Sequence, residues 1–193
     1  MNKINIYDFD GTIYSGDSTI DFYLFCLKNR VMIICYFPIQ VWYLILYKLK
    51  IKSKKEFKEK FFVFLKDIKP LDKYVEKFWD KNYKKIKEYY IKSVHKNDVI
   101  ISASPLFLIK VIGKKLKVLD VIATNVSSNG KIIGNNCYGE EKVALFEKKY
   151  KNVCVENVYT DSLSDLPIMK LGKKAYIVRK NIITEYKNKE NER

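Results

Sequence analysis

The stretch INIYDFDGT, residues 4–12, decides the fold of this chain. Its apolar first half predicts a short strand that ends at Asp8. Asp8 and Asp10 are two residues apart, so in an extended backbone both carboxylates point to the same side. Gly11 allows a sharp turn and a close approach of a ligand to the main chain. The Thr12 hydroxyl and the backbone N–H groups of such a turn can hold an anion. The stretch therefore predicts an anion site beside two acids.

Two acids beside a phosphate would repel it unless a hard cation lay between them. Mg²⁺ prefers oxygen ligands and keeps several waters, so it is the expected ion at this turn.

Length and composition set the class of protein. The 193 residues allow one good-sized domain with an insertion, or two small domains, and a hydrophobic content of 48% is enough for a packed core. The net charge of +15 favours anionic partners such as nucleic acid, membrane or acidic substrates. However, only three of the 37 basic residues are arginine, the residue that best reads base edges. We interpret most of the charge as solvated lysine and expect no nucleic-acid partner.

The cysteines predict a reducing compartment. The four cysteines, Cys26, Cys35, Cys137 and Cys154, show no C-x-x-C spacing, and the single His95 cannot complete a usual zinc site. They are expected to be small apolar fillers. No signal-peptide pattern precedes the first strand, so a cytoplasmic location is expected.

Residues 14–95 predict a helical insert with few Gly or Pro and many Lys. Its most apolar part is Val31 to Tyr47, seventeen residues without a charge, interrupted by Pro38. Three interpretations stay open for it: a buried helix of the insert, a helix on a membrane surface with Trp42 at the interface, or a true membrane span.

Beyond the insert, strands alternate with helices. Apolar runs predict strands at 98–102, 118–124, 153–159 and 175–178, helices at 105–113, 140–150 and 165–170, a small hairpin at 125–134, and a loosely ordered charged tail after residue 180. This order predicts a doubly wound α/β domain with a parallel sheet, formed by residues 1–13 and 96–193. Because such sheets bind ligands at the carboxyl ends of their strands, Asp8, Ser102 and Asp161 are expected to meet there.

Four motifs in order carry a resemblance to a known family. They are Asp8-Phe9-Asp10-Gly11-Thr12, then Ser102-Ala103-Ser104, then Lys142 behind Gly139-Glu140-Glu141, and finally Asp161 with Asp165. Together they resemble the haloacid dehalogenase superfamily of phosphohydrolases. The detail is similar to subfamily IB, whose members carry an all-helical cap between the first two motifs; here that cap is residues 14–95.

The resemblance implies a role for each matching residue. Asp8 is the expected nucleophile, giving an aspartyl-phosphate, and Asp10 the expected general acid and base. Gly11, Thr12, Ser102, Ala103 and Lys142 are expected to bind phosphate. Asp8, Asp10, Asp161 and Asp165 are expected to hold Mg²⁺.

The resemblance also implies a substrate class. The chain departs from phosphoserine phosphatases, which have Gly-Gly where Ala103-Ser104 stands, Ser at Gly11, Glu at Asp17 and usually Asn at Ser164. Its apolar, basic insert is more similar to members that hydrolyse phosphatidylglycerophosphate. The expected function is a Mg²⁺-dependent phosphomonoesterase acting on a lipid phosphate, with the insert against an anionic membrane surface. The alternatives are a phosphatase of phosphoserine or another small metabolite, and a non-catalytic basic protein that binds membrane or nucleic acid.

Overall fold

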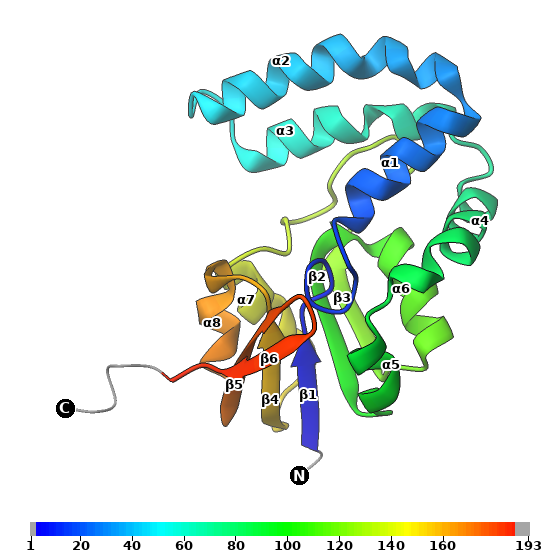
Figure 1. Ribbon diagram of the computed structural model, residues 1–193. Helices are drawn as coiled ribbons and strands as arrows, with labels where there is room; N and C mark the ends of the chain where they lie inside the picture. Colours follow the sequence, from blue (N-terminus) through cyan, green and yellow to red (C-terminus); the bar gives the residue numbers. More distant parts are fainter. Residues whose placement is uncertain (1–2, 188–193) are drawn as a thin grey trace.

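The computed structural model describes residues 3–187, and its centre is a six-stranded sheet in the order β3-β2-β1-β4-β5-β6 (Figure 1). The strands are β1 (Lys3–Tyr7), β2 (Asp98–Pro105), β3 (Asp120–Thr124), β4 (Cys154–Thr160), β5 (Lys174–Arg179) and β6 (Ile182–Glu185). The first five are parallel, and β6 pairs antiparallel with β5. The predicted doubly wound α/β fold is confirmed.

Helices connect the strands and cover both faces of the sheet. They are α1 (Ser18–Asn29), α2 (Phe37–Lys48), α3 (Lys54–Phe61), α4 (Leu71–Asn82), α5 (Glu88–Ser93), α6 (Leu106–Leu116), α7 (Glu140–Lys149) and α8 (Leu166–Met169). Short 3₁₀ turns are η1 (Val31–Tyr36), η2 (Phe62–Asp67), η3 (Tyr83–Lys85) and η4 (Leu163–Asp165).

Strand periodicity divides the core into two clusters. Along β1, Ile4 and Ile6 point to one face and Tyr7 to the other; along β2, Val99 and Ile101 oppose Ile100 in the same way. One cluster packs beneath α7 and α8, and the other beneath α6, α4 and α5. Burial on both faces explains why the parallel strands are nearly continuous apolar runs.

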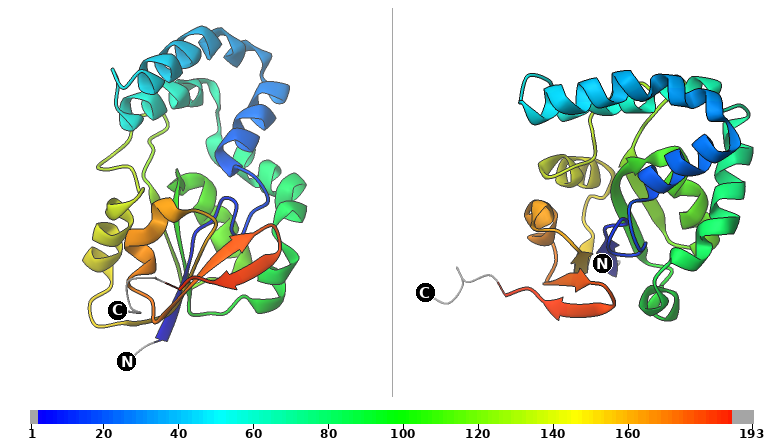
Figure 2. Two further views of the ribbon diagram at one scale, coloured as in Figure 1. Left: turned by 60° about the vertical axis from the view of Figure 1, so that its left-hand side comes forward. Right: turned by 45° about the horizontal axis from the view of Figure 1, so that its top comes forward.

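The helical insert between β1 and β2 has two parts. Helices α1 to α3 lie beyond the carboxyl ends of the strands, whereas α4 and α5 lie against the sheet and its helix α6 (Figures 1 and 2). Trp79 of α4 is fully buried, and its indole Nε1–H donates to the Leu108 carbonyl of α6 at 2.8 Å. The second half of the insert therefore shares the core with the α/β part. The division at residues 13/14 and 95/96 stays a prediction.

The apolar stretch Val31 to Tyr47 forms η1 and α2, and its interpretation as a buried helix is wrong. Helix α2 lies outermost in the insert and packs on α3 (Figure 2). Within the span 31–48 only 11% of the residues are buried. Because α3 is the neighbour of α2, one face of α2 is covered. That face carries the polar Gln40, which accepts from the Tyr23 hydroxyl at 2.8 Å and donates to the Phe61 carbonyl at 2.9 Å.

Two smaller expectations are corrected. Residues 182–185, placed by the sequence in a loose tail, form the edge strand β6, because their Ile-Ile-Thr run pairs with β5; residues 188–193 of that tail lie outside the described residues. The hairpin expected at 125–134 is reduced to one bridge between Val126 and Ile132 around a turn.

Candidate active site

The parallel register brings the first and last motifs to one edge of the sheet. Tyr7, the last residue of β1, is in register with Tyr159 of β4, which ends one residue later, and with Ile100 of β2, which continues to Pro105. Asp8 follows Tyr7 at once, and its N–H donates to the Tyr159 carbonyl at 2.9 Å. Asp161 follows β4 in the same way.

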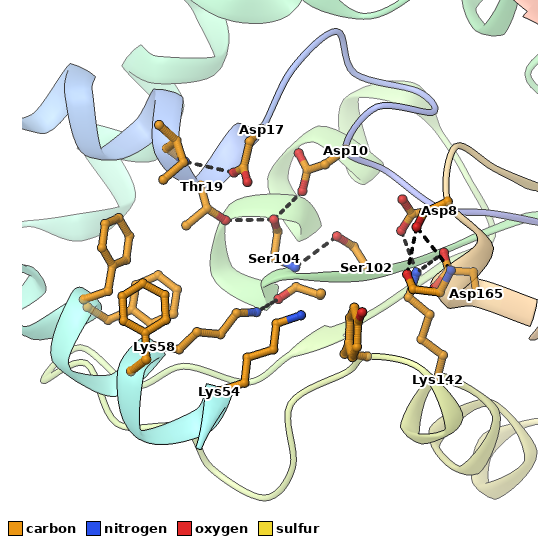
Figure 3. A pocket seen from close by; sticks show the side chains of 18 residues that line it. Asp8, Asp10, Asp17, Thr19, Lys54, Lys58, Ser102, Ser104, Lys142 and Asp165 are labelled. Atoms are coloured by element: carbon orange, nitrogen blue, oxygen red, sulfur yellow. Dashed lines mark hydrogen bonds and ion pairs between the residues drawn. The ribbon is translucent and has the colours of Figure 1, made fainter. Parts of the chain in front are cut away.

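Lys142 of α7 joins two of the expected carboxylates. Its Nζ donates to Asp8 Oδ1 and to Asp165 Oδ2, both at 2.7 Å (Figure 3). The Thr160 hydroxyl at the end of β4 donates to the same Asp165 oxygen at 2.8 Å. Lys142 is only 2% exposed and Asp165 only 3%. Burial alone would lower the pKa of Lys142, but the two carboxylates outweigh it and raise that pKa, so the lysine is a fixed positive charge beside Asp8.

Asp8 stands in an environment that disfavours its own charge. Burial raises the pKa of the Asp8 carboxyl to about 7, against the opposing attraction of Lys142. The neighbouring carboxylates of Asp165 and Asp10 add to this rise. The site therefore holds more negative charge than its one buried lysine neutralises.

Asp10 is fixed by residues to which the sequence assigned no role in the site. Its Oδ1 accepts from the Ser18 N–H at 2.6 Å, and the Ser104 hydroxyl donates to its Oδ2. The Ser104 hydroxyl also exchanges a hydrogen bond with that of Thr19 at 2.8 Å. Burial raises the pKa of Asp10 to about 6, and the Ser104 hydrogen bond partly opposes that rise. A carboxyl with this pKa can give and take a proton near neutral pH.

Glycine is required at position 11 by its backbone conformation and by the nearby side chain of Asp161, the residue that follows β4. Gly11 has φ +75°, and a Cβ placed there would lie 2.1 Å from Asp161 Oδ2. A side chain at this position would therefore displace Asp161, which explains why glycine follows Asp10.

Residues 6–170 match the haloacid dehalogenase-like hydrolase family. The chain belongs to this family. Among curated proteins, no sequence matches this hydrolase.

Solved structures with the same fold share little sequence with this haloacid dehalogenase-like hydrolase. A protein of unknown function from Bordetella pertussis Tohama I has a TM-score of 0.78 at 16% identity, covering 91% of this chain and 89% of that one. A phosphoserine phosphohydrolase-like protein from Francisella tularensis has a TM-score of 0.56 at 17% identity, covering 94% of this chain and 89% of that one. A substrate-bound phosphoserine phosphatase has a TM-score of 0.59 at 15% identity, covering 91% of this chain and 85% of that one. These solved structures show that the chain shares the fold of phosphoserine phosphatase-like proteins.

The hydrolase has a cavity of about 280 Å³ between the strand ends and the insert. Both parts of the chain contribute side chains to it (Figure 3). From the α/β part come Asp8, Asp10, Ser102, Ala103, Ser104, Tyr138, Lys142 and Asp165, and from α3 come Lys54, Phe57, Lys58 and Phe61. The cavity therefore offers carboxylates and a lysine at its floor, and lysines and phenyl rings at its roof.

Three expected site residues lie outside the lining of this cavity. Gly11 and Asp161 pack against each other at its side. Thr12 is fully buried, its carbonyl accepts from the Tyr89 hydroxyl at 2.8 Å, and its own hydroxyl has no partner among the described residues. By contrast, Ser102 and Ala103 do line the cavity; the Ser102 hydroxyl accepts from the Ser104 N–H at 3.1 Å.

The carboxylates suit magnesium in donor type and in charge. Asp8, Asp10, Asp161 and Asp165 offer the hard oxygen donors that this ion prefers, and burial raises the pKa of the first three. A divalent cation would neutralise their excess charge. Within residues 3–187 no three acidic, His or Cys side chains form a ready metal-binding group. The Lys142 ammonium lies between Asp8 and Asp165.

Proposed function

We propose that this hydrolase is a Mg²⁺-dependent phosphomonoesterase that works through an aspartyl-phosphate on Asp8. The observation that carries the proposal is the buried Asp8–Lys142–Asp165 arrangement at the strand ends, with Asp10 held nearby. A carboxylate with a fixed ammonium at 2.7 Å is poised to accept a phosphoryl group whose charge that ammonium stabilises.

The reaction divides into two displacements. An Asp8 oxygen attacks phosphorus, the bond from phosphorus to the alcohol oxygen breaks, and the Asp10 proton moves to that leaving oxygen. Water then attacks the phosphorus of the aspartyl-phosphate and gives a proton to Asp10, which releases inorganic phosphate and restores both acids. Lys142 stays charged throughout and balances the transferred phosphoryl group.

Magnesium would be held by Asp8, Asp10, Asp161 and Asp165, as phosphatases of this family typically hold Mg²⁺. When bound, it would screen the phosphate from the acids and stabilise the charge of the transfer state.

Phosphate release from a chromogenic ester tests this function. The wild-type chain should release phosphate with Mg²⁺ and lose that activity with a chelator, and Asp8→Asn should be inactive in both. A signal that persists in the chelator or in Asp8→Asn would contradict the mechanism. Binding of membrane or nucleic acid without any hydrolysis would instead favour the non-catalytic alternative.

A lipid phosphate such as phosphatidylglycerophosphate is the substrate we propose. Phe57 and Phe61 bring phenyl rings to the same cavity as the acids, so an apolar part of a substrate has a surface to contact. The alternative is phosphoserine or another small metabolite, since fold relatives of the chain are phosphoserine phosphatases by their descriptions. Comparing phosphate release from both kinds of ester separates the two.

The outer face of the insert is the part that we propose contacts an anionic membrane from the cytoplasmic side. We call this surface the outer apolar face; its exposed side chains are Val31, Met32, Ile34, Phe37, Ile39, Trp42, Leu44, Ile45, Leu49 and Ile51. An exposed patch of this extent is uncommon on a monomer unless it binds something. The lysines Lys48, Lys50 and Lys52 flank it, and an apolar face bordered by lysine and tryptophan suits anionic lipid.

Co-sedimentation with liposomes tests this contact. The chain should sediment with vesicles that contain phosphatidylglycerol at low salt, and less with neutral vesicles, because both charge and apolar burial contribute. Equal absence of sedimentation with both vesicle types would exclude the membrane contact while leaving the phosphatase proposal intact.

A further inference from the structure

The roof of the cavity contains a lysine that no carboxylate neutralises. Lys54 is the first residue of α3, and a capping box between Ser53 and Glu56 fixes that first turn. Its ammonium lies 3.2 Å from the centre of the Tyr138 ring, a cation–π contact across the cavity. Among residues 3–187, no acidic side chain lies within ion-pair distance of Lys54, whereas its neighbour Lys52 pairs with Glu56 at 2.7 Å.

Lys58 lies one helical turn further along α3, on the same face. It donates to the Ala103 carbonyl at 2.8 Å and to Asn136 Oδ1 at 2.7 Å, which leaves one of the three N–H donors of its ammonium for another partner. Both lysines extend from α3 toward the Ser102–Ser104 segment (Figure 3). Burial lowers the pKa of Lys58 to about 8 and also lowers that of Lys54. Partly buried cations without an acidic partner are costly, so the pair is suited to an anion.

This pair is not needed for the phosphoryl group that is transferred. Lys142 already lies beside Asp8 on the opposite, strand-end side of the cavity. Asp10, whose proton goes to the leaving oxygen, is held by Ser18 of α1 and by Ser104. In the proposed mechanism, groups on the insert side of Asp10 would therefore face the leaving alcohol of the substrate and not its phosphoryl group.

We infer that Lys54, together with Lys58, binds a second anionic group carried by the leaving alcohol of the substrate. This inference rests on the proposed phosphomonoesterase function. The group is a phosphodiester or a carboxylate, since either accepts from two ammonium groups. The cavity of about 280 Å³ is at the small end for a ligand site, so it takes a short doubly anionic head group and leaves any acyl chains outside.

Kinetics with substrates that differ in the second group test the inference. The substrates are glycerol 3-phosphate, with an uncharged leaving alcohol, 3-phosphoglycerate, with a carboxylate, and dihexanoyl phosphatidylglycerophosphate, with a phosphodiester. Lys54→Gln should raise KM by about tenfold to a hundredfold for one doubly anionic ester, as expected for loss of a charge-assisted hydrogen bond, and leave glycerol 3-phosphate nearly unchanged. Lys54→Arg should restore much of the affinity. The ester whose KM rises most in Lys54→Gln identifies whether the second anion is a carboxylate or a phosphodiester.

The control is Lys66→Gln, which removes one charge from an exposed position of the insert. It should leave every KM unchanged. An equal effect of Lys54→Gln on all three esters, or no effect on any, would overturn the inference.

Binding to an inactive enzyme separates this inference from the proposed function. Calorimetry with Asp8→Asn and with Asp8→Asn combined with Lys54→Gln measures affinity for the same esters without turnover. A loss of affinity of about tenfold or more in the double variant, confined to a doubly anionic ester, supports the second-anion site. That conclusion holds even if the wild type releases no phosphate, because missing phosphate release would contradict only the phosphatase proposal. Equal binding to both variants contradicts the site.

Discussion

The strand-end site and the outer apolar face reverse the usual distribution of side chains. At the strand ends, charged groups are buried: Lys142 is 2% exposed and Asp165 is 3% exposed. On the outer face, apolar groups are exposed: Met32 by 80% and Trp42 by 58%. Each arrangement costs free energy relative to an ordinary core and surface. The comparison teaches that function and stability depend on the same residues at the strand ends, whereas on the outer apolar face the two are separable.

Loss of Lys142 should have the largest effect. In Lys142→Met the Asp8 and Asp165 carboxylates stay buried without their partner. We expect the free energy of unfolding to fall by about 3–5 kcal/mol. Phosphate release should fall by about a hundredfold to a thousandfold. Denaturant unfolding and ester hydrolysis measure the two effects.

Lys148→Met is the matched control for that change, since Lys148 is an exposed residue of the same helix. It should be close to the wild type in both measurements. A Lys142→Met enzyme of normal activity would show that the buried ion pairs serve the fold alone.

Changes on the outer apolar face should affect binding without affecting stability. Met32→Gln combined with Trp42→Gln removes two exposed side chains, each of which contributes about 1.5–3 kcal/mol when fully buried. Binding to vesicles that contain phosphatidylglycerol should therefore weaken by at least about tenfold, with thermal unfolding and hydrolysis of a soluble ester unchanged.

Leu119→Gln, an exposed apolar residue before β3, is the control and should leave vesicle binding intact. If the double variant instead unfolds more easily, the face is part of the structural core of the insert and the separation is wrong.

Ser104→Ala should give the smallest effect, a shift in pH dependence. The Ser104 hydroxyl stabilises the ionised form of Asp10 and so lowers its pKa. Without it, the pKa of Asp10 rises above about 6, and the acid keeps its proton to higher pH. The alkaline limb of kcat should move upward by roughly half a pH unit to one unit.

A pH–rate profile of kcat checks this shift, with Ser128→Ala as an exposed control. A shift of the limb toward lower pH would show that Ser104 does not act through the ionised form of Asp10.

Local patterns predicted the strand-end motifs well. An apolar run followed by Asp8 and Asp10 needs only the geometry of one strand and one turn, and parallel strands necessarily share an edge for their ends. Contacts between distant segments could not be predicted in this way. Ser104 and Asp10 are 94 residues apart, and their hydrogen bond depends on how the turn after β1 lies beside the end of β2. The departure from Gly-Gly at residues 103–104 was the available signal.

The outer apolar face shows a second limit. The hydropathy of residues 31–47 is the same whether the helix is buried or exposed, and the outcome depends on how many neighbouring helices cover it. The edge strand β6 shows a third, since its β-branched residues were visible but lie among charged ones, which favour a loose tail.

Acid quench of the wild-type enzyme during turnover, followed by borohydride reduction and peptide mass spectrometry, locates the phosphoryl group on the enzyme. Borohydride converts an aspartyl-phosphate to homoserine, so the position of the covalent phosphate can be read from the peptides. We expect homoserine at residue 8, dependent on substrate and Mg²⁺ and absent from Asp8→Asn. Hydrolysis at the normal rate with homoserine at another acid, or with no modified residue at all, would contradict it.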